Sequence, residues 1–177
     1  MKTIPIISAR KIRQAVPKIE EKIKIKLSLN KKVLTIRGTE LNEYITEKII
    51  QAIDFGFEPE DALLLRNENF LLEFVNIKEH THRHHLEDIR SRVIGRNGKA
   101  KRTIEELTGA VLHINENSVG IIVDAEHVEQ TIQAIISLVQ GSKHSNVFAY
   151  LEKQNAKLRH LDTEDLGLKN PEKDLKN

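Results

Sequence analysis

Two glycines separated by two polar residues, in Gly95-Arg96-Asn97-Gly98, constrain this chain more than any other feature of its sequence. Apolar residues at helical spacing lie on both sides of the pair, with Ile89, Val93 and Ile94 before it and Ala100, Ile104 and Leu107 after it. This pattern predicts two helices joined by a very tight turn. Glycine adopts backbone dihedrals closed to other residues and lets a second backbone approach without a Cβ in the way. We expect the approaching group to be a phosphodiester backbone.

The turn carries a strong local positive charge, although the whole chain does not. Lys and Arg number 28 against 26 Asp and Glu, so net charge alone indicates no particular partner. Between residues 90 and 102, however, there is no acid and there are six cations: Arg90, Arg92, Arg96, Lys99, Lys101 and Arg102. Each phosphate that such a cation neutralises adds affinity that does not depend on base sequence. A solvated charged face is the alternative, and the clustering of the cations at the glycine turn favours binding.

Bases bound beside this turn would need a groove with apolar walls. The candidates are Ile89, Val93, Ile94, Ile104, Leu112 and Ile114, and base edges would then meet the strand around His113. The competing interpretation is that these residues are core, and we accept it for most of Ile104, Leu107 and Leu112. The residues predicted to contact the nucleic acid are therefore Arg92, Ile94, Gly95, Arg96, Asn97, Gly98, Lys99, Lys101, Arg102 and His113.

The first half of the chain predicts alternating strands and helices. We expect a strand over Thr3–Ile7, a helix capped by Ser8 over Ala9–Val16 that breaks at Pro17, and a short helical piece through Ile19 and Ile23. Then follow strands over Ile23–Leu29 and Val33–Ile36, a helix from Gly38-Thr39 to Gly56, and a brief helix over Pro59–Leu65.

The second half predicts a similar order of elements. After a linker at Arg66–Asn69 come a strand over Phe70–Ile77, a polar histidine loop over His80–His85 and the two helices around Gly95. Next come a hairpin of Val111–Ile114 and Val119–Val123, a helix capped by Asp124 that ends near Gly141, and a charged helix over Phe148–Leu161.

Two halves of this pattern match at an offset of about 85 residues. We predict an α+β fold of two β-α-α-β-β-α units, at 1–66 and 67–142, with a C-terminal helix at 143–161 and a flexible tail at 162–177. The first copy has no glycine between Ile7 and Leu27, and Pro17 falls near the place of the turn. We therefore expect the first unit to be structural or protein-facing and the second to bind nucleic acid.

Composition and motifs argue against several classes of protein. There is no cysteine, which excludes disulfides, thiolate zinc sites and cysteine nucleophiles. His80, His82, His84 and His85 have a spacing compatible with a transition metal, but a polar loop is the better interpretation. No phosphate-loop, dinucleotide or nucleophile motif is present, so we predict no cofactor and no enzymatic activity. No signal peptide or bilayer-spanning run is recognisable, and we expect a cytoplasmic protein.

Several segments resemble a known family. Val93-Ile94-Gly95-Arg96-Asn97-Gly98-Lys99, continued by Thr103-Ile104-Glu105-Glu106-Leu107-Thr108-Gly109, resembles a type I KH domain. Gly141-Ser142-Lys143-His144-Ser145-Asn146-Val147-Phe148 is similar to the segment after the last KH helix in archaeal members of the partner-of-Nob family of small-subunit ribosome assembly factors.

The resemblance implies a function that spacing alone does not. It implies two KH units side by side and binding of single-stranded RNA near the 3′ end of the small-subunit rRNA. It also implies that the protein acts together with the endonuclease that matures that end, and that it is linked to the α subunit of translation initiation factor two. Two alternatives stay open: a protein adaptor for these partners, and an RNA-binding regulator of another pathway.

Overall fold

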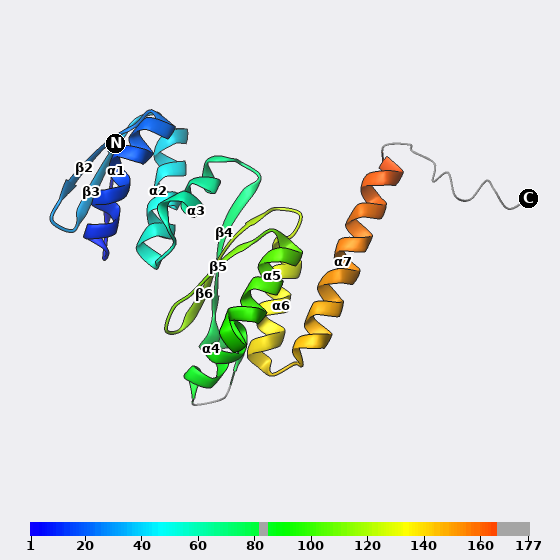
Figure 1. Ribbon diagram of the computed structural model, residues 1–177. Helices are drawn as coiled ribbons and strands as arrows, with labels where there is room; N and C mark the ends of the chain where they lie inside the picture. The colour runs from blue at the N-terminus through cyan, green and yellow to red at the C-terminus, as the bar shows by residue number, and fades with distance from the viewer. Residues whose placement is uncertain (82–84, 166–177) are drawn as a thin grey trace, which may run out of the picture.

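The computed structural model describes residues 1–81 and 85–165 and contains two α+β units followed by a long helix (Figure 1). The first unit runs β1 (Lys2–Pro5), α1 (Ala9–Ile23), β2 (Lys26–Asn30), β3 (Val33–Arg37) and α2 (Glu40–Phe55). Its strands form an antiparallel sheet in the order β1-β3-β2. Both helices pack on one face of this sheet, where Ile12, Ile19, Leu34, Ile36 and Ile49 are fully buried.

The helix break predicted at Pro17 is wrong, because α1 continues through this residue. Proline removes one hydrogen-bond donor from a helix, but Ala15, Ile19 and Ile23 on both sides of it are buried in the core. Burial of this apolar face outweighs the local preference for a break. The prediction that the Ser8 side chain caps α1 is also wrong, since the carboxylate of Asp54 instead accepts the backbone N–H groups of Ile7 and Ser8.

A short connection leads to the second unit. It consists of α3 (Pro59–Ala62) and a 3-10 turn, η1 (Leu63–Arg66), in the place predicted for a brief helix. The second unit then runs β4 (Phe70–Asn76), a 3-10 turn η2 (Ile77–His80), α4 (Leu86–Ile94), η3 (Arg96–Gly98), α5 (Lys99–Thr108), β5 (Val111–Ile114), β6 (Ser118–Asp124) and α6 (Val128–Gln140). Its antiparallel sheet has the order β4-β6-β5. His82 and His84 of the predicted histidine loop lie outside the described residues.

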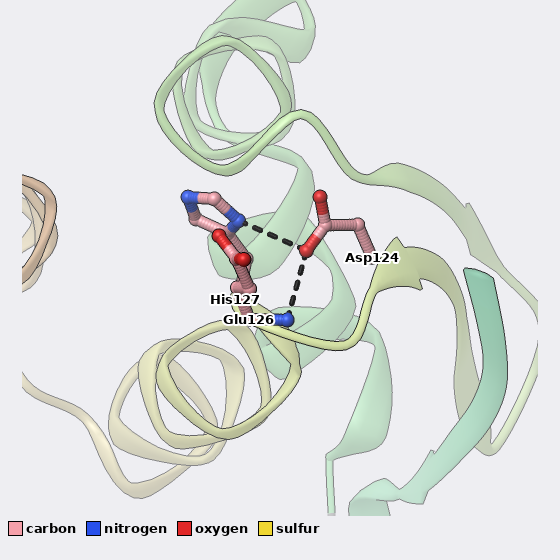
Figure 2. Close-up of side chains that lie close together, drawn as sticks. All are labelled: Asp124, Glu126 and His127. Atoms are coloured by element: carbon pink, nitrogen blue, oxygen red, sulfur yellow. Dashed lines mark hydrogen bonds and ion pairs between the residues drawn. The ribbon is translucent and has the colours of Figure 1, made fainter. Parts of the chain in front are cut away.

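Asp124 does not cap α6 as predicted, because the helix begins later, at Val128, with His127 at its N-cap. The carboxylate of Asp124 instead closes the turn before the helix (Figure 2). Its Oδ1 atom accepts the backbone N–H of Glu126 at 2.8 Å and lies 3.3 Å from Nδ1 of His127. The side chains of Asp124, Glu126 and His127 lie close together, and the bonds within the turn account for the positions of Asp124 and His127.

The internal repeat is present in the structure, with an offset of 85 residues. In the first unit Oε1 of Glu20 accepts the backbone N–H of Leu27 at 2.7 Å, and in the second unit Oε1 of Glu105 accepts that of Leu112 at 2.9 Å. Both members of the pair are 85 positions apart (105 − 20 and 112 − 27). At this offset α1 corresponds to α5 alone. The predicted β-α-α-β-β-α order therefore holds in the second unit, whereas the first lacks a counterpart of α4 and of the glycine turn.

The two units pack against each other through the sheet of the second. Ile122 is buried in the core of the first unit, and Leu72 and Val111 pack against the same core. At the centre of the contact, the ring centroids of Phe55 and Phe74 are 4.8 Å apart. A Cβ at Gly120 would lie 2.6 Å from the Phe55 ring, so the aromatic side chain requires glycine at this point of β6.

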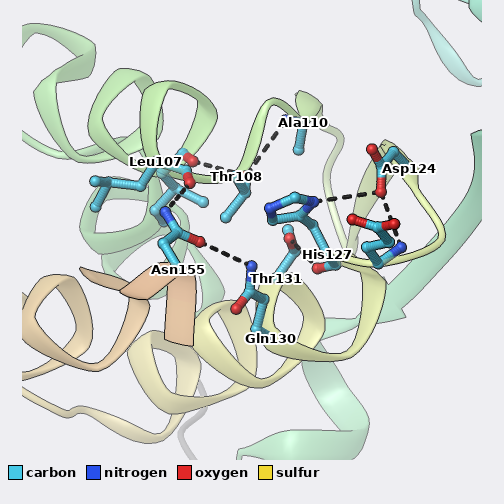
Figure 3. Close-up of polar contacts among 10 residues, drawn as sticks. Leu107, Thr108, Ala110, Asp124, His127, Gln130, Thr131 and Asn155 are labelled. Carbon is cyan, nitrogen blue, oxygen red and sulfur yellow. Dashed lines mark hydrogen bonds and ion pairs between the residues drawn. The ribbon is translucent and has the colours of Figure 1, made fainter. Parts of the chain in front are cut away.

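The C-terminal helix α7 (His144–Asp165) begins earlier than the predicted Phe148 and continues past the predicted end at Leu161. It lies beside α5 and α6 (Figure 1). Val147 and Leu151 are buried in the core of the second unit. Asn155 Nδ2 donates to the carbonyl of Leu107 at 2.5 Å, and its Oδ1 accepts from Gln130 at 3.1 Å (Figure 3).

The rest of the predicted tail, 166–177, lies outside the described residues. Among the helices of the described ranges, none is long and apolar enough to cross a membrane.

Candidate nucleic-acid interface

The turn between α4 and α5 has a backbone that requires glycine at its first position. Gly95, Asn97 and Gly98 all have positive φ, of 75°, 53° and 73°. A Cβ at Gly95 would lie 2.5 Å from Cβ of Ala100, closer than two non-bonded carbon atoms can approach. At Gly98, by contrast, an added Cβ would meet no heavy atom of the described residues within 4 Å. Gly95 therefore lets α5 pack tightly against the turn, while Gly98 leaves the outer side of the turn open to a second backbone.

Arg102 holds this turn in shape. Its Nη2 atom donates to the carbonyl of Asn97 at 2.9 Å, and the N–H of Gly98 donates to the carbonyl of Gly95 at 3.1 Å. The turn is thus held by its own hydrogen bonds and does not need a ligand to order it. A preorganised turn loses less conformational freedom on binding.

Arg96, Asn97 and Lys99 project from the turn into solvent. All three residues are exposed. Among the described residues, the side chains of Arg96 and Lys99 have neither a hydrogen bond nor an ion pair. Two exposed cations, without a partner among the described residues, therefore flank the open glycine in the sequence, where they can meet an anionic ligand.

Two other predicted cations are engaged in contacts within the protein. Nη2 of Arg92 donates to the carbonyl of Ser142 at 2.7 Å, which links α4 to the segment before α7. Lys101 forms an ion pair with Glu105 at 3.3 Å on the surface of α5. The Arg92 side chain is thus occupied by a contact within the protein. Lys101 is half-exposed and can exchange its ion pair with Glu105 for one with another anion.

A groove runs beside the turn between α4 and the β5–β6 hairpin. Ile94, which is 36% exposed, and Ile114 form its apolar part. The remaining lining is polar: Glu87, Arg90, Ser91, Asn115 and Glu116. The groove therefore has one apolar patch next to the cationic turn, a composition suited to a base whose phosphate lies on the turn.

His113, which was predicted to meet bases, has its ring at the contact between the units. The ring centroid lies 5.8 Å from that of Phe55 and 5.6 Å from that of Phe57. Burial lowers the pKa of His113 below its usual 6.5, and the nearby charges of Lys11 and Lys101 lower it further. The imidazole is therefore neutral at physiological pH and packs as an aromatic side chain.

The backbone N–H and C=O groups at the free edge of β5 belong to the neighbours of His113 in the strand and not to His113 itself. The N–H of Leu112 points away from β6, toward Glu105, while the N–H of Asn115 donates to Ser118 across the hairpin. Backbone groups of successive residues in a strand point to opposite sides. The groups of Ile114 therefore lie at the free edge beside the groove, and those of His113 face β6. The sequence-based prediction missed this alternation. The available signal was the pair of Glu and Leu that both units repeat, because the Glu side chain accepts the N–H of the Leu and so marks that N–H as pointing away from the neighbouring strand.

Comparison with known proteins shows which domain the second unit resembles. Residues 71–156 match a family described as "Eukaryotic type KH-domain (KH-domain type I)". A KH domain-containing protein of Methanocaldococcus jannaschii is 32% identical over 148 residues, which cover 80% of this chain and 65% of that protein. The chain spans only about half of the Candida albicans relative, the pre-rRNA-processing protein PNO1, to which it is 27% identical.

Two solved structures share the whole arrangement of units. Dim2p from Pyrococcus horikoshii has a TM-score of 0.76 and 31% identity, covering 86% of this chain and 98% of that one. A second structure, a complex of a/eIF2alpha, aDim2p and rRNA from the same organism, matches with a TM-score of 0.78 and 29% identity, covering 88% and 94%. The predicted fold of two KH-like units and a C-terminal helix is thereby confirmed. With its KH turn, its two units and this similarity along the chain, the protein belongs to the partner-of-Nob (PNO1/Dim2) family of KH-domain proteins.

Proposed function

We propose that this protein binds single-stranded RNA through the turn Gly95–Gly98 and the groove beside it. The observation that carries the proposal is the open, preorganised turn at Gly98 with the exposed cations Arg96 and Lys99 next to it. One phosphate would lie over Gly98, and the neighbouring base would contact Ile94 and the edge backbone of Ile114. Arg102 would act by holding the turn, and Arg92 by joining α4 to the segment before α7, rather than by touching RNA.

The names of the relatives support the choice of RNA target. PNO1 proteins carry the name pre-rRNA-processing protein, and a related Dim2p was solved together with rRNA. We therefore infer that this protein binds the 3′ end of the small-subunit rRNA during ribosome maturation, in the cytoplasm and without catalysing a reaction itself. The KH domain that binds would comprise residues 67–142, and residues 1–66 would form the domain without the glycine turn.

Replacing Arg96 and Asn97 by Asp tests the site. Both residues are exposed, and Asp tolerates the positive φ of Asn97, so the fold should persist. Two carboxylates at the turn would repel phosphate, and we expect affinity for an rRNA 3′-end oligonucleotide to fall by roughly 100-fold. Fluorescence anisotropy at fixed salt measures this loss.

The chain contains a matched control. Arg66 and Asn67 repeat the same dipeptide on the connection between the units and are equally exposed. R66D/N67D changes net charge by the same amount and should bind RNA nearly as well as the unmodified protein. Equal affinities of the two double variants would refute the site.

Crosslinking and sequencing of bound RNA would reveal a regulator of another pathway if the recovered RNA were not ribosomal.

A second role as a protein adaptor is favoured by one comparison. The related aDim2p was solved in a complex with a/eIF2alpha as well as rRNA. We propose that this chain also binds the α subunit of initiation factor two, through surfaces other than the glycine turn. The R96D/N97D variant should then retain the α subunit in a pull-down while losing RNA, and loss of both would place the partner at the turn.

A further inference from the structure

The glycine turn contains the only asparagine of this chain that is followed by glycine, in Asn97-Gly98. Asparagine is one of the thermally labile residues, because its side-chain amide carbon can be attacked by the backbone nitrogen of the next residue. A following glycine leaves that nitrogen accessible, since it carries no side chain that would shield it. The amide most prone to this attack therefore lies in the candidate RNA-binding turn.

Both reacting groups lie on the open side of the turn. Asn97 is exposed, and among the described residues its side-chain amide has no hydrogen-bond partner. An added Cβ at Gly98 would meet no heavy atom of the described residues within 4 Å. A five-membered ring formed between these two residues therefore has room on the outer side of the turn.

The observed backbone keeps the two groups apart. Ring closure needs the Gly98 nitrogen and Cβ of Asn97 on the same side of the bond between Cα and the carbonyl carbon. At the observed ψ of 32° for Asn97, they lie on opposite sides of this bond. The peptide unit between the two residues must therefore rotate before the reaction can occur.

Two hydrogen bonds oppose this rotation, one at each end of the same peptide unit. The N–H of Gly98 donates to the carbonyl of Gly95 at 3.1 Å. Nη2 of Arg102 donates to the carbonyl of Asn97 at 2.9 Å. Because both bonds break when the unit rotates, each of them lowers the population of the reactive conformation.

We propose that Asn97 is a deamidation site, that Arg102 slows the reaction, and that the product inactivates the glycine turn. When the turn opens locally, the Gly98 nitrogen attacks Cγ of Asn97 and forms a cyclic imide. The proton of the Gly98 nitrogen leaves with the side-chain nitrogen as ammonia. Water then opens the imide at either of its carbonyls, which yields aspartate or isoaspartate.

The product changes the charge and the backbone of the turn. A neutral amide becomes a carboxylate next to Gly98, and isoaspartate also adds one carbon atom to the main chain. A negative charge where a phosphate would lie should weaken RNA binding, and this consequence rests on the proposed function. A phosphate over Gly98 would hold the same peptide unit in place, so bound RNA should slow the reaction.

The rate of deamidation can be tested without RNA. The protein is incubated at mildly alkaline pH and digested, and conversion of Asn97 to aspartate or isoaspartate is followed by mass spectrometry. Arg102 is exposed, so R102Q should fold, and loss of its bond to the Asn97 carbonyl should raise the rate roughly fivefold. Asn117 is an exposed internal reference in the same digest, and its rate should not differ between the proteins.

The matched control for R102Q is R96Q. It removes one positive charge from the same turn, but the Arg96 side chain has no hydrogen bond with a described residue. Its rate should stay within about twofold of that of the unmodified protein. Equal rates in R102Q and R96Q would overturn the role of Arg102, and absence of conversion at Asn97 in all three proteins would overturn the whole inference.

A binding experiment tests the consequence separately. During incubation the unmodified protein should lose affinity for the rRNA 3′-end oligonucleotide in proportion to the fraction converted. N97G has no amide at this position and tolerates the positive φ, so it should keep the affinity that it had before incubation. Converted protein that binds RNA as before would refute the turn as the RNA site, and with it the inactivation, although the modification itself would stand.

Discussion

At the scale of single residues, the two units end equivalent helices with the same backbone conformation but with different amino acids. Lys24 ends α1 and Gly109 ends α5, and both adopt the left-handed conformation with φ of 57° and 67°. Each N–H donates to the carbonyl four residues earlier, on Glu20 and Glu105. Glycine takes this conformation without steric cost, whereas a side chain with a Cβ does not.

Lys24→Gly should therefore stabilise the protein. Relief of the left-handed strain outweighs the added freedom of the unfolded chain, for a net gain of about 0.5–1 kcal/mol. Urea denaturation would measure it. Lys22→Gly, in the same helix but with ordinary helical geometry, should have the opposite sign and cost about 1 kcal/mol. If both variants lost stability equally, the strain at Lys24 would not exist.

At the scale of elements, α7 provides hydrogen-bond partners for the C-terminal ends of two other helices. The last four carbonyls of a helix have no partner within it, and α7 supplies partners for one carbonyl in α4 and one in α5. Nε2 of His144 lies 2.8 Å from the carbonyl of Arg92, and Asn155 donates to that of Leu107. The same two helices carry the glycine turn between them. The C-terminal helix therefore holds in place the two helices that carry the candidate RNA site.

Asn155→Ala should destabilise the second unit by about 1–2 kcal/mol, because it leaves the Leu107 carbonyl and the Gln130 amide without this partner. Thermal unfolding followed by circular dichroism would report the loss. Asn146, in the same helix, is exposed and its side chain has no hydrogen bond with a described residue. Asn146→Ala should therefore leave stability within about 0.5 kcal/mol of the unmodified protein, and an equal effect of the two variants would contradict the capping role.

At the scale of the whole molecule, the contact between the units depends on aromatic rings around two glycines. A Cβ at Gly56 would lie 2.2 Å from Nε2 of His113, just as Gly120 leaves room for Phe55. His113 thus contacts both units, and burial of its ring, together with the nearby charges of Lys11 and Lys101, lowers its pKa and disfavours the protonated form.

This arrangement predicts that the protein loses stability in mild acid. Because folding lowers the pKa of His113 from 6.5, the unfolded chain binds the proton first as the pH falls. Stability is therefore complete above pH 6.5 and decreases below it, until the folded protein is protonated as well. Denaturation at about pH 7.5 and 5.5 should show a larger loss for the unmodified protein than for His113→Gln. The same loss in both proteins would exclude His113 as the source.

The sequence alone determined the glycine turn, its cations, the repeat and the apolar faces of nearly every element. These features are local, because Gly95 and Gly98 dictate backbone geometry and periodic Ile, Leu and Val dictate which face is buried. Tertiary structure decided the rest. Whether α1 breaks at Pro17 depends on the core that Ile19 joins, and whether Arg92 meets RNA depends on Ser142, fifty residues away. One sheet face became an interface at Ile122 and stayed open at Arg37, the equivalent residue of the first unit, because only folding determines which surfaces meet.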